Sequence, residues 1–222
     1  MRATPMGATY ADRTEAGDRL AAELMGYAGR SDLVVLGLVR GGVPVASRVA
    51  AALPAPLDVM VVRKLGVPWS PEVAFGAVGP GGVVVHNPEV EGYISAGDVE
   101  SVTKAESEEL VRREQLYRKG RPPLSLEGQV AIIVDDGLAT GATARASVAV
   151  ARRLGAAHVV VAVPVGAPDA VATLRREADE VVCPLMPADF GAVSRFYQHF
   201  PQTSDEEVVA LLEASRHERD QR

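Results

Sequence analysis

The sequence predicts a doubly wound α/β fold, in which a mostly parallel five-stranded sheet is flanked by helices. Two observations support this prediction. Short apolar runs recur along the chain, and most are continuous rather than alternating, which is typical of strands buried on both faces. Helical patterns separate most of the runs, as the crossover connections of a parallel sheet require. The five runs are 33–38, 57–62, 131–134, 159–163 and 180–183.

Three further helices can be predicted from their own patterns. Residues 12–29 have apolar side chains at helical spacing, which turns Arg13 outward. Asp98 is the expected N-cap of a long and strongly charged helix. Near the end of the sequence, Ser204 and Glu207 have the spacing of a capping box, so we expect a final helix to begin there.

Length, composition and charge limit the classes of protein to which the chain can belong. The chain has 222 residues, of which 47% are hydrophobic, and this suits one domain with a full core. The net charge of −6 argues against non-specific binding of nucleic acid. No apolar run reaches the length of a membrane span, and the first residues form no hydrophobic signal region. We therefore expect a cytoplasmic protein with no nucleic-acid or membrane partner.

The single cysteine, Cys183, excludes a disulfide framework within this sequence and a cysteine-based metal site. It follows Val181 and Val182 in the last apolar run. A reactive thiol needs a basic neighbour that lowers its pKa, and the local sequence has none. We expect Cys183 to be a small, buried apolar residue.

The stretch 130–147 gives the strongest chemical signal. An apolar run leads into Asp135 and Asp136, and a turn of small residues, 137–143, leads into a helix. Ligands of a parallel sheet lie beyond the carboxyl ends of its strands, and a helix N-terminus favours an anion. Two carboxylates would repel a phosphate, so they fit a polyhydroxyl group or a metal ion beside it. A phosphate next to a diol, with Mg²⁺, indicates a sugar phosphate.

Two other runs also end in residues that favour anions. The first is followed by an arginine and two glycines, and glycine lets the backbone approach a ligand closely. The second is followed by two adjacent cations. A tight turn is the alternative for the glycines, and a solvated basic pair is the alternative for the cations. The residues are Arg40, Gly41 and Gly42 in the first loop and Arg63 and Lys64 in the second.

This constellation resembles the PRPP-binding motif of the type I phosphoribosyltransferases: apolar residues, two acidic residues, and a loop ending in Thr-Gly-x-Thr. It stands here as IIVDD followed by GLATGAT. The arrangement LVRGG, VVRKLGVP and PEVAFGAV is most similar to stand-alone bacterial members whose substrate is not settled. The resemblance implies one domain over 1–222 with a small hood. It implies a helical and loop insertion at about 65–122, and a hood plus C-terminal helix at about 184–217.

The resemblance also implies an activity and the residues that perform it. A Mg²⁺-dependent enzyme would transfer the 5-phosphoribosyl group of PRPP to a small-molecule nitrogen acceptor, a nucleobase by preference, releasing pyrophosphate, and it would act as a homo-oligomer, a dimer. Asp135 and Asp136 would hold the ribose hydroxyls and, through water and PRPP, the metal. The 5-phosphate would lie on Ala139, Thr140, Gly141, Ala142 and Thr143. Pyrophosphate would lie on Arg40, Gly41, Gly42, Arg63 and Lys64.

The acid or base of the reaction is harder to assign. Hypoxanthine and guanine enzymes of this family have an Asp in the phosphate loop where this chain has Ala139. Residues 65–97 are the least regular part, although 83–86 could pair back as a hairpin. The family has its mobile catalytic loop in this region. Glu72 is therefore our candidate for the acid or base, with His86 as the alternative.

Two other questions stay open at this stage. Phe190 is the candidate for stacking on the acceptor ring, with core packing as the alternative. A non-catalytic PRPP-binding sensor or regulatory protein is the alternative function; a basic DNA-binding extension would favour it, and the sequence has none. PRPP synthesis fits poorly, because the chain is too short for the duplicated architecture of those enzymes.

Overall fold

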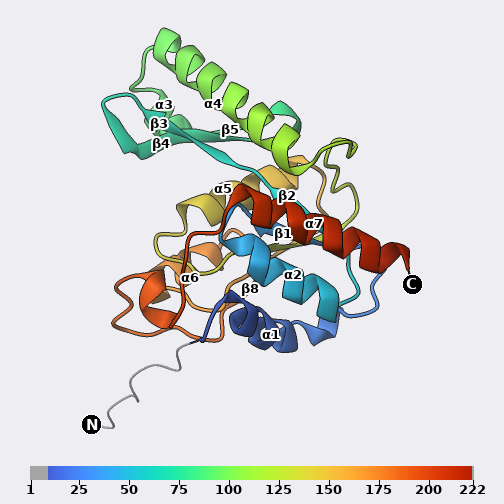
Figure 1. Cartoon of the computed structure of the whole chain (residues 1–222). Coiled ribbons are helices and arrows are strands. Elements are labelled where there is room, and N and C mark those ends of the chain that lie inside the picture. Colours follow the sequence, from blue (N-terminus) through green and yellow to red (C-terminus); the bar gives the residue numbers. More distant parts are fainter. Residues whose placement is uncertain (1–9, 222) are drawn as a thin grey trace.

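The computed structural model describes residues 10–221, apart from the side chains of 71, 72 and 220. Its centre is a five-stranded sheet in the order β2-β1-β6-β7-β8 (Figure 1). Every neighbouring pair in this sheet is parallel, which confirms the predicted fold class. The strands are β1 (Leu33–Leu38), β2 (Leu57–Met60), β6 (Val130–Val134), β7 (His158–Ala162) and β8 (Glu180–Val182).

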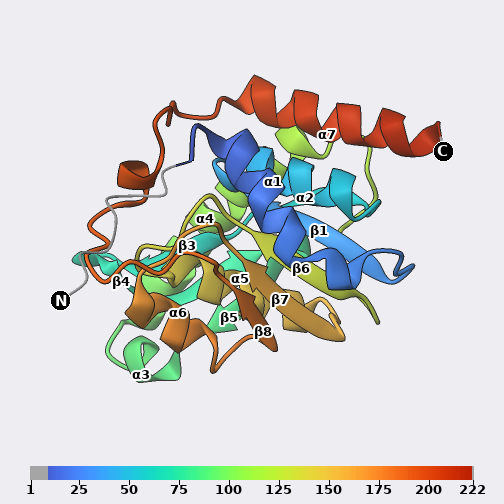
Figure 2. The ribbon, with the colours of Figure 1, turned by 90° about the horizontal axis from the view of Figure 1, so that it is seen from below.

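Helices cover both faces of this sheet, because successive strand residues point to opposite sides. Val35 and Ile132 pack into a core with α1, α2 and α7. Their neighbours Leu36 and Ile133 pack into a second core with α5 and α6. Figure 2 shows α1, α2 and α7 together on one side of the sheet. The helices are α1 (Arg13–Glu23), α2 (Gly42–Ala52), α5 (Ala142–Arg153), α6 (Pro168–Leu174) and α7 (Asp205–Asp220).

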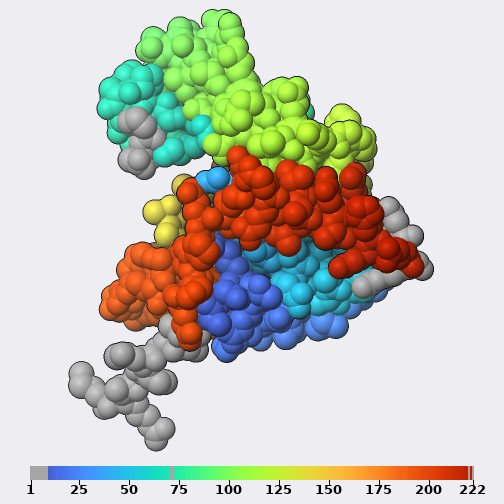
Figure 3. Space-filling model, in the orientation of Figure 1, coloured from blue at the N-terminus to red at the C-terminus, as the bar shows by residue number. Residues whose placement is uncertain are grey.

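A smaller lobe projects from the body at one end (Figures 1 and 3). It contains a three-stranded antiparallel sheet in the order β3-β4-β5, with two helices beside it. The predicted hairpin is confirmed, because β5 pairs back on β4. The strand β3 was missed, since the sequence marked its residues as turn formers. The elements are β3 (Arg63–Val67), β4 (Ser70–Gly79), β5 (Val83–His86), α3 (Pro88–Glu91) and α4 (Ala96–Tyr117).

The start of α4 corrects one prediction. Ser95, not Asp98, is the N-cap: its hydroxyl accepts the Asp98 N–H at 3.1 Å. The same hydroxyl donates to the Asp98 carboxylate at 2.7 Å. Asp98 is therefore the third residue of α4, a position where the helix dipole favours an acid. Ser204 is confirmed as the N-cap of the final helix, because its hydroxyl accepts the Glu207 N–H at 3.2 Å.

Short 3₁₀ helices complete the chain: η1 (Met25–Tyr27), η2 (Pro80–Gly82) and η3 (Val193–Phe196). The first of them extends α1, so the predicted helix 12–29 is an α-helix followed by a 3₁₀ turn. Within residues 10–221, no helix is both long enough and apolar enough to span a bilayer.

Candidate functional site

The acidic pair follows β6, near the middle of the carboxyl edge of the central sheet. The Asp136 N–H donates to Asp135 Oδ1 at 2.9 Å. Burial raises the pKa of Asp135 well above its usual range, and the adjacent Asp136 carboxylate adds to the rise. Burial also raises the pKa of Asp136, although the Arg13 guanidinium opposes that rise. Two partly buried carboxylates in this arrangement favour a ligand that brings positive charge or hydroxyl donors.

The loop after β1 lies directly against this pair. A Cβ on Gly41 would overlap Oδ2 of Asp136. A Cβ on Gly42 would overlap the Val134 carbonyl and lie 2.8 Å from the Cα of Asp135. Only glycine permits such an approach. The structure therefore brings the loop 40–42 and the acidic pair together, although they are about ninety residues apart in the sequence.

The third part of the site is the loop 137–143 and the start of α5. Gly141 is the N-cap and has φ of 77°, a left-handed conformation that favours glycine. The N-cap residue makes no side-chain hydrogen bond, and the Ala142 N–H makes only a long one, to Thr140 Oγ1 at 3.4 Å. An anion can therefore bind the N–H groups of the first turn. Four loop residues are exposed: Ala139, Thr140, Ala142 and Thr143. In Figure 3 residues near 140, coloured yellow, reach the surface in a recess below the lobe.

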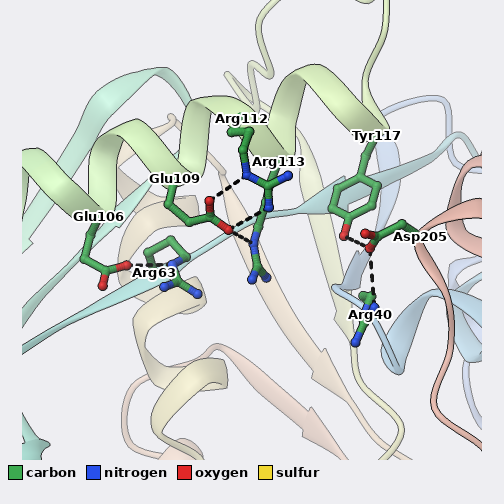
Figure 4. A network of polar contacts seen from close by, with 8 residues as sticks. All are labelled: Arg40, Arg63, Glu106, Glu109, Arg112, Arg113, Tyr117 and Asp205. Carbon is green, nitrogen blue, oxygen red and sulfur yellow. Dashed lines mark hydrogen bonds and ion pairs between the residues drawn. The ribbon is translucent and has the colours of Figure 1, made fainter.

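Arg40 belongs to a polar network that joins three elements (Figure 4). Its guanidinium pairs with Asp205, the first residue of α7, at 3.6 Å. The hydroxyl of Tyr117, near the end of α4, donates to the same carboxylate at 2.6 Å. Burial, with the hydrogen bond to Asp205, raises the pKa of Tyr117 to about 12, so this hydroxyl is a donor at neutral pH. The network thus holds Arg40 between the body and the lobe.

The two cations predicted after the second strand lie in the lobe. Both begin β3, because β2 ends at Met60. Arg63 Nε donates to the Glu106 carboxylate of α4 at 2.7 Å (Figure 4). Lys64 is the next residue of the same strand. The structure therefore places Arg63 beneath α4, whereas Arg40 lies in the loop that contacts the acidic pair.

The candidates for acid, base and stacking come from β4, β5 and the segment after β8. Glu72 is in β4, and its side chain is outside the part of the chain that the structure describes. His86, in β5, has Nδ1 2.8 Å from the Glu91 carboxylate. Phe190 is 7% exposed and packs 5.4 Å from the ring of Phe196. The position of Phe190 favours the alternative of core packing.

Sequence reasoning missed two residues that contact Asp136. Arg13 was predicted to face outward, which is wrong: its side chain is 11% exposed and donates to the Asp136 carboxylate at 2.7 Å. Tyr197 donates its hydroxyl to the backbone carbonyl of Asp136 at 2.6 Å, and burial raises the pKa of that hydroxyl. Helical periodicity could not reveal the contact of Arg13 with Asp136. Periodicity predicts which face of a helix is buried, but it does not predict which distant segment lies next to the first residue of that helix.

Three comparisons with known proteins bear on this site. A family model described as the phosphoribosyl transferase domain matches residues 9–197. Two Mycobacterium tuberculosis proteins, from strains CDC 1551 / Oshkosh and ATCC 25618 / H37Rv, carry the names "Putative phosphoribosyl transferase MT0597" and "Putative phosphoribosyl transferase Rv0571c". Each is 52% identical over 206 residues, which cover 92% of this chain and 46% of the relative. The chain thus spans about half the length of these curated relatives.

A solved structure agrees over almost the whole fold. The crystal structure of TT1426 from Thermus thermophilus is 43% identical, with a TM-score of 0.85. The alignment covers 92% of this chain and 97% of that one. The region that the family model matches includes the loop 40–42, the acidic pair and the loop 137–143. The chain therefore belongs to the phosphoribosyl transferase domain family, as the resemblance of its sequence motif implied.

Proposed function

We propose that this protein transfers the 5-phosphoribosyl group of PRPP to a nitrogen acceptor, by preference a nucleobase, and releases pyrophosphate. The observation that carries the proposal is the meeting of three features at one edge of the sheet. These are a partly buried acidic pair, a glycine loop pressed against it, and an uncapped helix N-terminus. Each feature suits one part of PRPP: the ribose diol, the pyrophosphate and the 5-phosphate.

The 5-phosphate would lie on the start of α5. Its oxygens can accept hydrogen bonds from the N–H groups of the first turn, and the helix dipole favours their charge. Thr140 and Thr143 are exposed, and the Thr140 hydroxyl accepts the Ala142 N–H at 3.4 Å. Asp135 and Asp136 would accept the ribose 2- and 3-hydroxyls. This arrangement holds the donor by both ends, and precise holding of a reactant is itself a large part of catalysis.

The residues present fit a Mg²⁺ ion held jointly with PRPP. Among the residues described, no cluster of three His, Cys, Asp or Glu side chains could hold a metal. Two carboxylates are the usual protein share for Mg²⁺, which keeps several waters and takes its other ligands from phosphates. Asp135 and Asp136 would provide that share, mostly through water. The ion would supply positive charge that stabilises the leaving pyrophosphate.

The pyrophosphate would lie against the loop 40–42, with Arg40 as its principal cation. Arg40 is partly exposed and paired with Asp205 at 3.6 Å, beyond hydrogen-bonding distance, so a phosphate oxygen can compete for it. Arg63 and Lys64 begin the lobe, and we propose that they reach the pyrophosphate when the lobe approaches the body. The acceptor would then enter between lobe and body, where Glu72 and His86 remain its candidate partners.

The test is pyrophosphate release from PRPP with Mg²⁺ across a panel of nucleobases and other amines. Calorimetric titration with PRPP runs in parallel. We expect binding and, with one acceptor, release. Tight binding without release from any acceptor would favour the sensor.

Matched variants test the site itself. Asp135→Asn and Asp136→Asn should each weaken PRPP binding by at least about tenfold, because each removes a charge-assisted contact. Asp32→Asn is the control, since Asp32 forms an exposed ion pair with Arg30. Binding that survives both site variants would show that PRPP lies elsewhere.

A further inference from the structure

The guanidinium of Arg13 is enclosed by protein beside the acidic pair. Nε and Nη2 donate to Asp136 Oδ2 at 2.9 and 2.7 Å. Nη1 donates to the carbonyl of Pro201 at 2.7 Å. The ring of Phe200 lies under the guanidinium, with its centroid 3.8 Å from Cζ. Three of the five N–H donors and one flat face are therefore occupied by the protein itself.

This enclosure distinguishes Arg13 from the arginines proposed to bind pyrophosphate. Arg40 and Arg63 are each about one-third exposed, at 31% and 30%, whereas Arg13 is 11% exposed. A guanidinium that is bound to Asp136, Pro201 and Phe200 is poorly placed to move toward a ligand. It is well placed to hold a neighbouring carboxylate in one orientation.

The oxygen that Arg13 holds is also the one that touches the pyrophosphate loop. Both of its bonds to the carboxylate end on Oδ2 of Asp136. A Cβ on Gly41 would overlap that oxygen and would lie 3.4 Å from Nη2 of Arg13. Oδ2 is therefore fixed between the guanidinium and the backbone of Gly41. Arg13 thus sets where Asp136 stands relative to the loop 40–42.

Two distant segments brace this arrangement. The backbone N–H of Tyr10 donates to the Phe196 carbonyl at 2.8 Å, and that of Gln198 donates to the Tyr10 carbonyl at 2.9 Å. The hydroxyl of Tyr197 donates to the carbonyl of Asp136. The segment before α1 and the segment after η3 therefore run side by side and clamp Asp136 by both its side chain and its backbone.

We propose that Arg13 is a positioning residue of the phosphoribosyl-donor site, acting through Asp136. This inference rests on the proposed function. Arg13 holds one carboxylate in a fixed orientation and offsets one of two adjacent negative charges. The pair then presents a defined geometry to the ribose diol, without Arg13 touching the donor.

The test is a double-mutant cycle read by PRPP titration with Mg²⁺ and by denaturant unfolding. Arg13→Met should weaken PRPP binding by at least about tenfold. Arg13→Lys should recover part of the loss, because it keeps the charge but not the forked geometry. Arg13→Met/Asp136→Asn should bind no worse than Asp136→Asn alone, since the two residues act as one unit. Arg48→Met is the control, because Arg48 pairs with Asp18 on an exposed surface.

Each outcome decides the role. Unchanged PRPP affinity in Arg13→Met overturns the positioning role. The role is also overturned if Arg13→Met weakens PRPP binding equally in the unchanged chain and in Asp136→Asn. If methionine prevents folding, Arg13→Lys alone decides: full affinity overturns the role, and a partial loss that disappears in the Asp136→Asn background supports it. Failure of the unchanged chain to bind PRPP overturns both this inference and the proposed function. If the unchanged chain binds PRPP but the double-mutant cycle shows no coupling between Arg13 and Asp136, only the inference about Arg13 is overturned.

Discussion

At the scale of single residues, the glycines of the loop 40–42 show how closely the backbone must approach the acidic pair. Gly42 is the first residue of α2, although glycine is one of the poorest helix formers. The space around it is closed by the end of β6 and by Asp135. Its identity is therefore set by the site and not by helix formation.

Gly42→Ala should lower the free energy of unfolding by about 1–3 kcal/mol, since the added methyl must displace backbone. It should also weaken PRPP binding, because the loop moves away from the acidic pair. Denaturant unfolding and calorimetric titration measure the two effects. Gly26→Ala is the matched control, because a Cβ there meets nothing within 4 Å. Equal stability of the two variants would contradict the close approach.

Cys183 is a small buried residue, as its sequence context predicted. Burial raises the pKa of its thiol to about 11 from the ordinary value of 9.0. A raised pKa means less thiolate at pH 8, by roughly a hundredfold for two pH units. The folded protein should therefore react with a thiol reagent at least that much more slowly than the chain unfolded in urea. Rapid labelling of the folded protein would contradict the burial.

Several residues of the candidate site could be predicted because their signal is local. Asp135, Asp136 and the loop 139–143 follow an apolar run directly, and the ends of parallel strands gather at one edge. Arg13 and Tyr197 could not be predicted, since they reach Asp136 from segments far away in the sequence. Their role depends on the tertiary fold, which brings the first turn of α1 and the segment after η3 together next to Asp136.

At the scale of elements, the strands of the central sheet could be predicted and β3 could not. The central strands are mostly apolar, and β1 and β6 are apolar and buried along their whole length. β3 begins with Arg63 and Lys64, and its pairing with β4 is irregular at Leu65 and Gly66. Such a strand forms through pairing with its partner, and no periodic pattern in its own sequence indicates it.

The contact between α4 and α7 can be tested through Tyr117. Tyr117→Phe removes the hydrogen bond to Asp205 and should lower the free energy of unfolding by about 1.5–3 kcal/mol, the range for bonds to charged groups. Amide exchange in the first turn of α7 should quicken, because Asp205 loses one of its two partners. Tyr93→Phe is the control, since Tyr93 is 86% exposed on the same lobe. Similar effects in both variants would mean that the bond does not join the helices.

At the scale of the whole molecule, the fold class was predictable and the division into body and lobe was only partly so. Parallel βα units are specified by buried runs and the helices between them. The lobe shares its core with the body: Leu65, Phe75 and Leu110 pack into the same cluster as Leu20 and Val49. The position of the lobe therefore follows from long-range packing. The periodic patterns that identify single helices and strands in a sequence do not predict such packing.

The clamp on Asp136 has a consequence for the order in which the sheet and the candidate site can form while the chain is being synthesised. All five strands of the central sheet have left the ribosome once residue 182 is exposed. The segment 196–201, which holds Arg13 and the carbonyl of Asp136, follows later. A nascent chain can therefore complete its sheet before Tyr197 reaches the carbonyl of Asp136 and Pro201 reaches Arg13. The candidate site around Asp136 would then be completed after the sheet that supports it.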